Sequence, residues 1–434
     1  MSAFEVGLIG IGVLFLILLL DMPIGFAMAL VGFGGFAILV GTPGALSNLA
    51  LIPVSIVTEY HFAVVPLFVL MGAIAASCGI TKDLYNAAYY WVGQYRGGLA
   101  SATVLACGGF AAVTGSAMAG SAAMGQIVGP EMRRHHYDPR LATGSVAAGG
   151  TLGVLIPPSM GFILYAILTE QSIGRLFIAG IFPGILEIVF YLFTIFIICR
   201  INPAMGPAGP NIGWKSKLLS LKATGPVLLL FGLVMGGIYL GWFTPPEAGA
   251  IGAFGTIILG LVLRRISVKG FGESFLDTAR ITTMVMVLII GAFIFARFLA
   301  VTRMPFVLAD MVAHISLPPY AILVLILFFY IVMGCLFDLL SIMVLTIPIL
   351  FPVAMALGFD PIWYGVLMVR VMEVGAITPP IGINTYVIAG IMKVPAGAVF
   401  RGIVPFVIAD FLHIALLAAI PQISLFLPNL MIGK

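Results

Sequence analysis

Long uninterrupted apolar runs constrain the fold of this chain more than any other feature of its sequence. Val6–Leu20 and Val324–Leu336 are two of many such runs. A hydrocarbon core of roughly 30 Å is crossed by about 20 apolar helical residues, so the runs predict whole or half crossings of a lipid bilayer. They do not alternate in hydrophobicity as the strands of a membrane barrel do. We therefore expect an all-α polytopic membrane protein.

The composition points the same way. Charged residues make up 8% of the chain and hydrophobic residues 62%, whereas soluble domains carry about 25% charged residues. The 20 basic and 16 acidic residues are spread along the whole chain, so no basic face predicts nucleic-acid binding. The cysteines stand singly in apolar stretches, and the scattered histidines form no nucleophile–base or metal constellation. We expect a protein that is not an enzyme.

A single offset of 222 residues superimposes helix-breaking residues of the two halves of the chain. Because such a coincidence over a long stretch is improbable, the chain is interpreted as two copies of one unit. The first unit covers residues 1–200 and the second 223–434, with a cytoplasmic linker at 201–222. The matching residues include Pro23 with Pro245, Asp138-Pro139 with Asp360-Pro361, Gly153 with Gly375, and Pro157-Pro158 with Pro379-Pro380.

Each unit is predicted to contain a re-entrant hairpin and a broken helix. The hairpins are expected at about 98–129 and 319–356, with polar tips at membrane depth, where irregular backbone must be buried in protein or line a cavity. The broken helices are expected at about 141–169 and 362–392. Adjacent prolines there remove two backbone donors and clash with preceding carbonyls. A proline kink satisfied by neighbouring helices is the alternative interpretation of each break.

The basic residues predict the orientation of the two units, because Lys and Arg concentrate in cytoplasmic loops. Placing the loop Arg133–Arg140 inside puts most of the 20 basic residues inside. Its counterpart near Asp360-Pro361 then falls outside, so the two units are inverted. Inverted repeats with broken helices at matching positions are typical of secondary transporters, whose substrate and ion sites lie near the membrane midplane.

The broken helices and hairpin tips carry the predicted ion sites. Freed carbonyls and nearby hydroxyls suit a hard cation such as sodium, and the following half-helix presents its positive end to an anion. Asp338, which the offset pairs with Ser116, is an acid at membrane depth and a functional candidate, with helix capping or pairing with Arg370 as the alternative. The candidate sodium-binding residues are Thr114, Gly115, Ser116, Gly153, Pro157, Ser159, Asp338, Gly375, Thr378 and Pro379. Sodium is the only metal expected, and no organic cofactor is.

Arg370 and Glu373 lie three residues apart, just before the second break. This spacing puts both on one helix face and predicts an ion pair between them. In the alternative interpretation the broken backbone holds Glu373, and Arg370 is free to attract a substrate carboxylate.

A family resemblance rests on two motifs, Gly153–Ser159 and Gly375–Asn384, and on the segments Leu345–Pro352 and Gly358–Pro361 between them. From about Asp21 to the last span, the chain resembles the large membrane subunit of tripartite ATP-independent periplasmic (TRAP) transporters. The resemblance implies a sodium-coupled elevator in the bacterial inner membrane that imports carboxylate-bearing solutes. It also implies two partners, a small four-helix membrane subunit and a periplasmic substrate-binding protein.

In this interpretation Arg370, Asn384 and Thr385 are the candidate substrate-binding residues, suited to many carboxylates. The first hairpin tip, Gly115–Ser121, departs from the family pattern. Other classes stay open: a one-component sodium-coupled anion transporter, a channel, or a structural membrane subunit. A channel needs a continuous polar lining, whereas polar residues here cluster at two points, and a structural subunit has no need of polar tips at depth.

Overall fold

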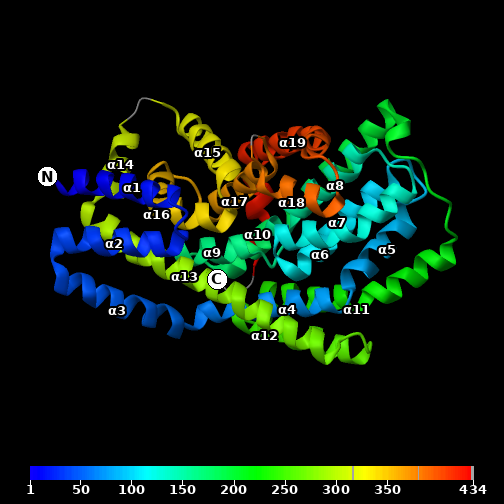
Figure 1. The fold of residues 1–434 in the computed structure, drawn as a ribbon, viewed down its shortest axis with the longest axis horizontal. Coiled ribbons are helices and arrows are strands. Elements are labelled where there is room, and N and C mark those ends of the chain that lie inside the picture. Colours follow the sequence, from blue (N-terminus) through cyan, green and yellow to red (C-terminus); the bar gives the residue numbers. More distant parts are fainter. Residues whose placement is uncertain (315–316, 380, 432–434) are drawn as a thin grey trace.

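The computed structural model of this protein describes residues 1–314, 317–379 and 381–431, and the regular secondary structure of these residues is helical (Figure 1). Short 3-10 helices lie at Tyr60–Ala63 and Pro203–Met205. The α-helices of the first half are α1 (Ala3–Leu19), α2 (Ile24–Val40), α3 (Thr42–Thr58), α4 (Val64–Ser77), α5 (Ile80–Val92), α6 (Gly98–Thr114), α7 (Ala117–Arg134), α8 (Pro139–Leu155), α9 (Met160–Thr169) and α10 (Ile173–Ile201). Those of the second half are α11 (Trp214–Tyr239), α12 (Pro245–Val262), α13 (Val268–Thr302), α14 (Met304–Ala313), α15 (Pro319–Leu336), α16 (Leu339–Ala356), α17 (Pro361–Ile377), α18 (Ile383–Met392), α19 (Ala396–Ala419) and α20 (Gln422–Leu430).

The helices carry the apolar surface that a membrane requires. Within the described part of the chain, eight helical segments are long and apolar enough to span a bilayer. Large apolar side chains such as Phe193, Leu229 and Phe254 point outward and are more than half exposed. So extensive an exposed apolar surface is covered by lipid or by another protein in a stable molecule. The prediction of an all-α polytopic membrane protein is confirmed.

Helix boundaries in the two halves repeat at the offset found in the sequence. α8 and α17 start at Pro139 and Pro361 and end at Leu155 and Ile377, so both ends differ by 222 residues. α7 and α16 correspond in the same way. The first hairpin runs past the expected residue 129, because α7 continues through Pro130 to its basic last turn.

The two halves differ in the helices outside the hairpins. In the first half α3 and α4 are separate, and the segment between them includes Glu59 and His61, which are exposed and hydrogen-bonded to each other (3.0 Å). In the second half the corresponding stretch lies within α13, one continuous helix of 35 residues. α13 packs along both α2 and α4.

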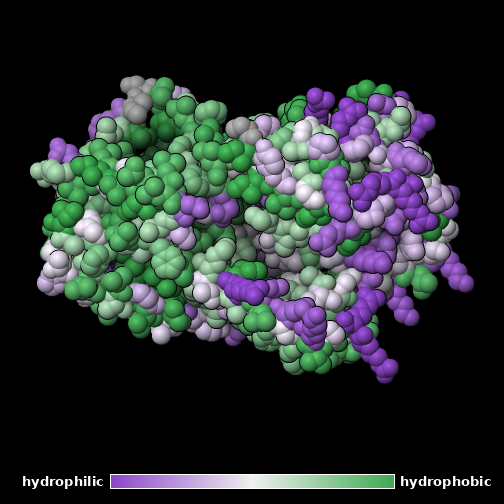
Figure 2. Space-filling view, in the orientation of Figure 1, coloured by the Kyte–Doolittle hydropathy of each residue, from purple (hydrophilic) through white to green (hydrophobic). Residues whose placement is uncertain are grey.

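The two hairpins approach from opposite ends of the molecule. In Figure 1 α6 and α7 lie in the right half and α15 and α16 in the left half, while α10 and α17 lie between them. Figure 2 shows hydrophilic side chains gathered at the right-hand end of this face, where α10 ends and α11 begins. Those helix ends carry Arg200, Lys215 and Lys217. This asymmetry agrees with the orientation derived from the basic residues.

An Asp-Pro pair starts each broken helix. Proline at the first helical position lacks only a donor that would be unpaired there anyway. Asp138 accepts a hydrogen bond from the Arg140 N–H (2.8 Å), and Asp360 accepts from the N–H groups of Ile362 (2.8 Å) and Trp363 (3.0 Å). Hydrogen bonds from the Arg140 side chain also hold the pKa of Asp138 below its ordinary value. These caps fix where α8 and α17 enter the core.

Removing the cap of α17 tests its contribution to stability. We expect Asp360→Ala to lower the free energy of unfolding by about 1 kcal/mol, because an N-cap side chain satisfies otherwise unpaired helix donors. Asp360→Asn should lose less, since its amide oxygen still accepts. Thermal unfolding in detergent measures the difference. The control is Asp277→Ala, which removes an exposed acid that pairs with Arg280 at 3.6 Å; equal losses in both alanine variants would contradict the assignment.

Candidate ion and substrate site

The first break lies between α8 and α9, where residues 156–159 leave the helical path. Ser159 bridges the break: its hydroxyl donates to the Val154 carbonyl and accepts from the Phe162 N–H (3.2 Å). Pro157 and Ser159 are both buried. One serine therefore satisfies polar backbone on both sides of a break that the prolines prevent from closing.

The tip of the α6–α7 hairpin packs directly onto this break. Gly115 adopts the left-handed region (φ +62°), and its carbonyl accepts from the Met160 N–H (3.4 Å). A Cβ added to Gly115 would collide with the carbonyl oxygen of Pro158. A Cβ added to Gly153 would lie 2.8 Å from the backbone of Ser116. The structure thus brings these predicted residues together, and glycines make the approach possible.

Two hydroxyls at this tip keep acceptor capacity. Thr114 donates its hydroxyl hydrogen to the Phe110 carbonyl (3.1 Å), and Ser116 accepts from the Ala119 N–H (3.4 Å). A hydroxyl has two lone pairs, so each oxygen retains one or more for another partner. Both residues are half-buried. Such oxygens suit a hard cation.

The second break has the same construction. α17 ends at Ile377 and α18 starts at Ile383, after Gly382 in the left-handed region (φ +56°). Thr378 is half-buried and donates its hydroxyl hydrogen to the Val374 carbonyl (2.6 Å), which leaves its lone pairs free. The exposed Pro379 belongs to this break. Pro380, the second proline of the predicted pair, lies outside the described residues.

The second hairpin packs against α17 through paired glycines. A Cβ added to Gly375 would lie 2.6 Å from the Cα of Gly334 in α15, so the two helices approach closely here. At the hairpin tip Asp338 caps α16, accepting from the Ser341 N–H (3.2 Å) and from its hydroxyl. Of the alternatives given for Asp338, capping is the one that the structure shows; Arg370 has other partners.

Arg370 forms a buried ion pair that the sequence did not predict. Its guanidinium, on a residue 1% exposed, pairs with Glu187 of α10 (3.0 Å) and Asp410 of α19. Glu373 instead accepts from the Asn384 side chain (3.2 Å) across the break. The predicted Arg370–Glu373 ion pair is therefore wrong. Helical spacing identifies neighbours on one helix only, whereas the partners of Arg370 come from two other helices.

The candidate substrate residues are all buried in this conformation. Asn384 and Thr385 are 3% and 0% exposed at the start of α18, and the Thr385 hydroxyl reaches the Ile377 carbonyl (3.4 Å). A substrate could reach Arg370 only if its ion pairs opened. Substrate contact by Arg370, Asn384 and Thr385 stays a prediction.

Sequence reasoning missed four residues of this region: Glu187, Tyr191, Asp410 and His413. All four are buried beside Arg370. The two acids had a usable signal, because each stands inside a long apolar span, where a carboxylate is costly and rarely without function.

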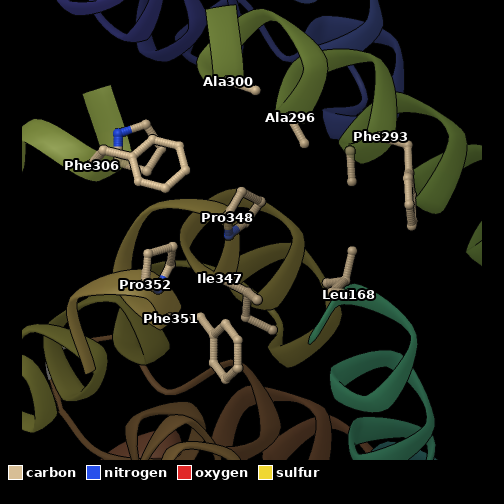
Figure 3. Close-up of a pocket in the computed structure, with 11 residues that line it drawn as sticks. Leu168, Phe293, Ala296, Ala300, Phe306, Ile347, Pro348, Phe351 and Pro352 are labelled. Carbon is tan, nitrogen blue, oxygen red and sulfur yellow. The ribbon is translucent and has the colours of Figure 1, made fainter. Parts of the chain in front are cut away.

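A separate cavity of about 240 Å³ lies between α9, α13, α14 and α16 (Figure 3). Figure 3 shows Phe306, Pro348 and Phe351 around it. A charged solute would lose its hydration there without gaining partners, so this cavity is no counterpart of the polar sites. Its lining is apolar: Leu168, Ala292, Phe293, Ala296, Ala300, Pro305, Phe306, Ile347, Pro348, Phe351 and Pro352.

Two broken helices at matching points, each packed against a hairpin, are typical of membrane transporters. A solved transporter structure has the same fold: the YdaH transporter of Alcanivorax borkumensis, described as having an unusual topology, matches with a TM-score of 0.62 and 15% identity over 87% of this chain and 89% of that one. Residues 11–423 match the family model of the tripartite ATP-independent periplasmic transporter, DctM component. The chain belongs to this family of large TRAP transporter membrane subunits.

Two named relatives match nearly the whole chain. The C4-dicarboxylate TRAP transporter large permease protein DctM of Pseudomonas aeruginosa is 36% identical over 91% of this chain and 92% of its own length. The sialic acid TRAP transporter large permease protein SiaM of Vibrio cholerae is 32% identical over 96% of this chain and 97% of its own length. The family resemblance inferred from the two proline motifs is confirmed, and the protein is a multi-pass membrane permease subunit.

The capping role of Asp338 separates its structural from its functional contribution. Asparagine also caps helices well. We therefore expect Asp338→Asn to fold, with a free energy of unfolding within about 0.5 kcal/mol of the wild-type value. Uptake should nevertheless fall roughly tenfold or more, because the variant loses the carboxylate charge of the candidate sodium ligand. An interaction with a charged group contributes about 1.5–3 kcal/mol. Thermal unfolding and uptake in proteoliposomes measure the two effects. Normal uptake with a lowered melting temperature would show that Asp338 acts as a cap alone.

Proposed function

We propose that this chain is the permease subunit of a sodium-coupled TRAP transporter that imports a carboxylate-bearing small solute across the bacterial inner membrane. The observation that supports this most directly is the matched pair of sites at the two breaks. Each combines a helix interruption, an adjoining hairpin tip and half-buried hydroxyl oxygens. An ion that binds at such a junction joins the hairpin to the broken helix and favours one conformation over another.

Sodium is the coupling ion that fits these sites. Hydroxyl and carbonyl oxygens are ligands for hard cations, and Thr114, Ser116 and Thr378 retain free lone pairs. The half-helices α9 and α18 begin directly after the breaks, so their positive ends face the same region. A cation at each break and an anion near the half-helix ends thus stabilise one another.

The substrate class follows from this electrostatic arrangement and from the relatives. Helix N-termini favour anions, and the two relatives described above are named for C4-dicarboxylates and sialic acid, which carry carboxylates. Asn384 and Thr385 lie in the first turn of α18, where a rearrangement of the break would expose them to a solute carboxylate.

Conserving the fold while removing one hydroxyl tests the sodium sites. Ser116→Ala and Thr378→Ala should each raise the sodium concentration for half-maximal uptake roughly fivefold, since one ligand hydrogen bond or equivalent contact contributes about 1 kcal/mol. Uptake is measured in proteoliposomes with the partner proteins over a sodium series.

Each variant has a control with the same local hydrogen bond elsewhere. Ser267→Ala removes a serine that caps α13 (3.0 Å to Gly270 N–H), and Thr194→Ala removes a threonine that donates to the Phe190 carbonyl of its own helix (2.8 Å). Both controls should keep the wild-type sodium dependence. If Ser116→Ala and Thr378→Ala behave like their controls, the site assignment is wrong.

Transport by an elevator requires a frame that stays still while the hairpins and broken helices move. We assign α13, together with α2 and α4 that pack along it, to this frame, braced by the short helices α5 and α14. A small four-helix membrane subunit on the exposed apolar faces of the frame would widen it, and a periplasmic binding protein would deliver the solute to the outer face. The alternative is a one-component sodium-coupled transporter of the same architecture.

Reconstitution distinguishes a permease that depends on its partner proteins from a one-component transporter. The chain alone, with solute and a sodium gradient, should give uptake near background. Adding the small subunit and the solute-loaded binding protein together should restore it, whereas either partner alone should not. Solute uptake is measured in proteoliposomes that contain the purified chain alone, the chain with either partner, or the chain with both partners. Strong sodium-driven uptake by the isolated chain would place it among one-component transporters instead.

A further inference from the structure

A cluster of buried charged and polar side chains connects the two broken helices. We call it the buried ion cluster; it comprises Thr151 of α8, Glu187 and Tyr191 of α10, Arg370 of α17, and Asp410 and His413 of α19. Each of these residues is at most 1% exposed. The three charged residues are desolvated at a considerable energetic cost, and buried ion pairs often add little net stability. Their burial therefore points to a role in positioning rather than in stability.

The hydrogen bonds of the cluster run from one broken helix to the other. The Thr151 hydroxyl lies within hydrogen-bonding distance of Glu187 Oε1 (3.1 Å), of the Tyr191 hydroxyl (3.0 Å) and of the Ala148 carbonyl in its own helix (2.6 Å). Its single hydrogen serves one of these acceptors at a time, and its lone pairs can accept from Tyr191. Arg370 Nη2 pairs with the same Glu187 oxygen (3.0 Å) and donates to the same Tyr191 hydroxyl (3.3 Å). Two paths of polar contacts therefore join α8 to α17: one runs from Thr151 through Glu187 to Arg370, and the other from Thr151 through Tyr191 to Arg370.

The ends of these paths lie close to the proposed ion sites. Thr151 is two residues before Gly153, against which the first hairpin tip packs. On the other side Arg370 is one turn before Glu373, which binds Asn384 across the second break (3.2 Å). A shift of either break thus moves a residue that is bonded into the cluster.

The cluster also lies where equivalent positions of the two units meet. The 222-residue offset carries Thr151 onto Glu373 and Tyr191 onto His413. Arg370 contacts both units, since it donates to His413 Nδ1 (3.3 Å) as well as to Tyr191. Four buried atoms, Glu187 Oε2, Arg370 Nη1, Asp410 Oδ2 and His413 Nε2, make no hydrogen bond to any residue that the structure describes, so the cluster has spare hydrogen-bonding capacity for a second arrangement.

We propose that the buried ion cluster couples the two breaks, so that sodium binding at one changes the affinity at the other. Thr151, Tyr191 and Glu187 are positioning residues in this scheme and do not contact the ions. A connected network of hydrogen bonds and ion pairs with more than one arrangement can carry coupling between two sites, and the effect is reciprocal between them. The inference rests on the proposed sodium-coupled function.

The sharpest test is Thr151→Val, which keeps the side-chain shape and removes the hydroxyl shared by both paths. Sodium-dependent uptake by the full transporter in proteoliposomes should show a Hill coefficient well above one in the wild type. In Thr151→Val the coefficient should fall toward one while uptake still requires sodium. Tyr191→Phe cuts one path and should give an intermediate coefficient; if Thr151→Val does not fold, Tyr191→Phe decides the test.

Matched controls remove equally buried hydroxyls elsewhere. Thr346→Val removes a hydroxyl that donates to the Ile342 carbonyl (2.7 Å), and Tyr330→Phe one that faces Tyr364 (3.5 Å). Both should keep the wild-type coefficient. The proposed coupling would be overturned by a Hill coefficient of one in the wild type, or by equal Hill coefficients in the cluster variants and the controls. Either result would leave the proposed function intact. Uptake that does not depend on sodium in the wild type would overturn the proposed function and the coupling with it.

Discussion

Helical hydrogen bonding is interrupted at residues 156–159, inside a segment apolar enough to span a bilayer, and again between the end of α17 at Ile377 and the start of α18 at Ile383. In hydrocarbon each unsatisfied backbone group costs several kcal/mol, so each interruption needs polar partners from the protein. The first break obtains them from Ser159 and from the Gly115 carbonyl of the hairpin tip. The hairpins, the glycines that let them approach and the buried core around them follow from this requirement.

The same requirement explains why the candidate site residues lie at backbone junctions. A break satisfied only by rigid side chains would be a static kink. Here hydroxyls at half-buried positions keep lone pairs free, while the fully buried Asn384 and Thr385 are already bonded within the protein. In the proposed function, an ion at the junction would complete the polar contacts of the break, and its binding energy would be available to select a conformation.

The buried charges occupy a different place from the proposed ion sites. Arg370, Glu187 and Asp410 form their pairs at the centre, between helices of both units. Because removing one partner leaves a buried charge uncompensated, the three residues constrain one another and the three helices that carry them, α10, α17 and α19. A displacement of any one of these helices would therefore disturb the ion pairs that the other two make.

The sequence by itself determined the membrane class, the repeat, the broken helices and the family. Each of these features produces a pattern that can be recognised along the sequence: apolar runs, an offset shared by prolines, and motifs of fixed spacing. Capping by Asp338 was also among the alternatives that local spacing allowed. The tertiary structure alone decided the partners of Arg370, because Glu187 and Asp410 are far from it along the chain and only packing of α10, α17 and α19 brings them together. It likewise decided that the tip of the first hairpin meets Gly153 and Pro158, since close backbone approach depends on how helices cross and not on the order of their residues.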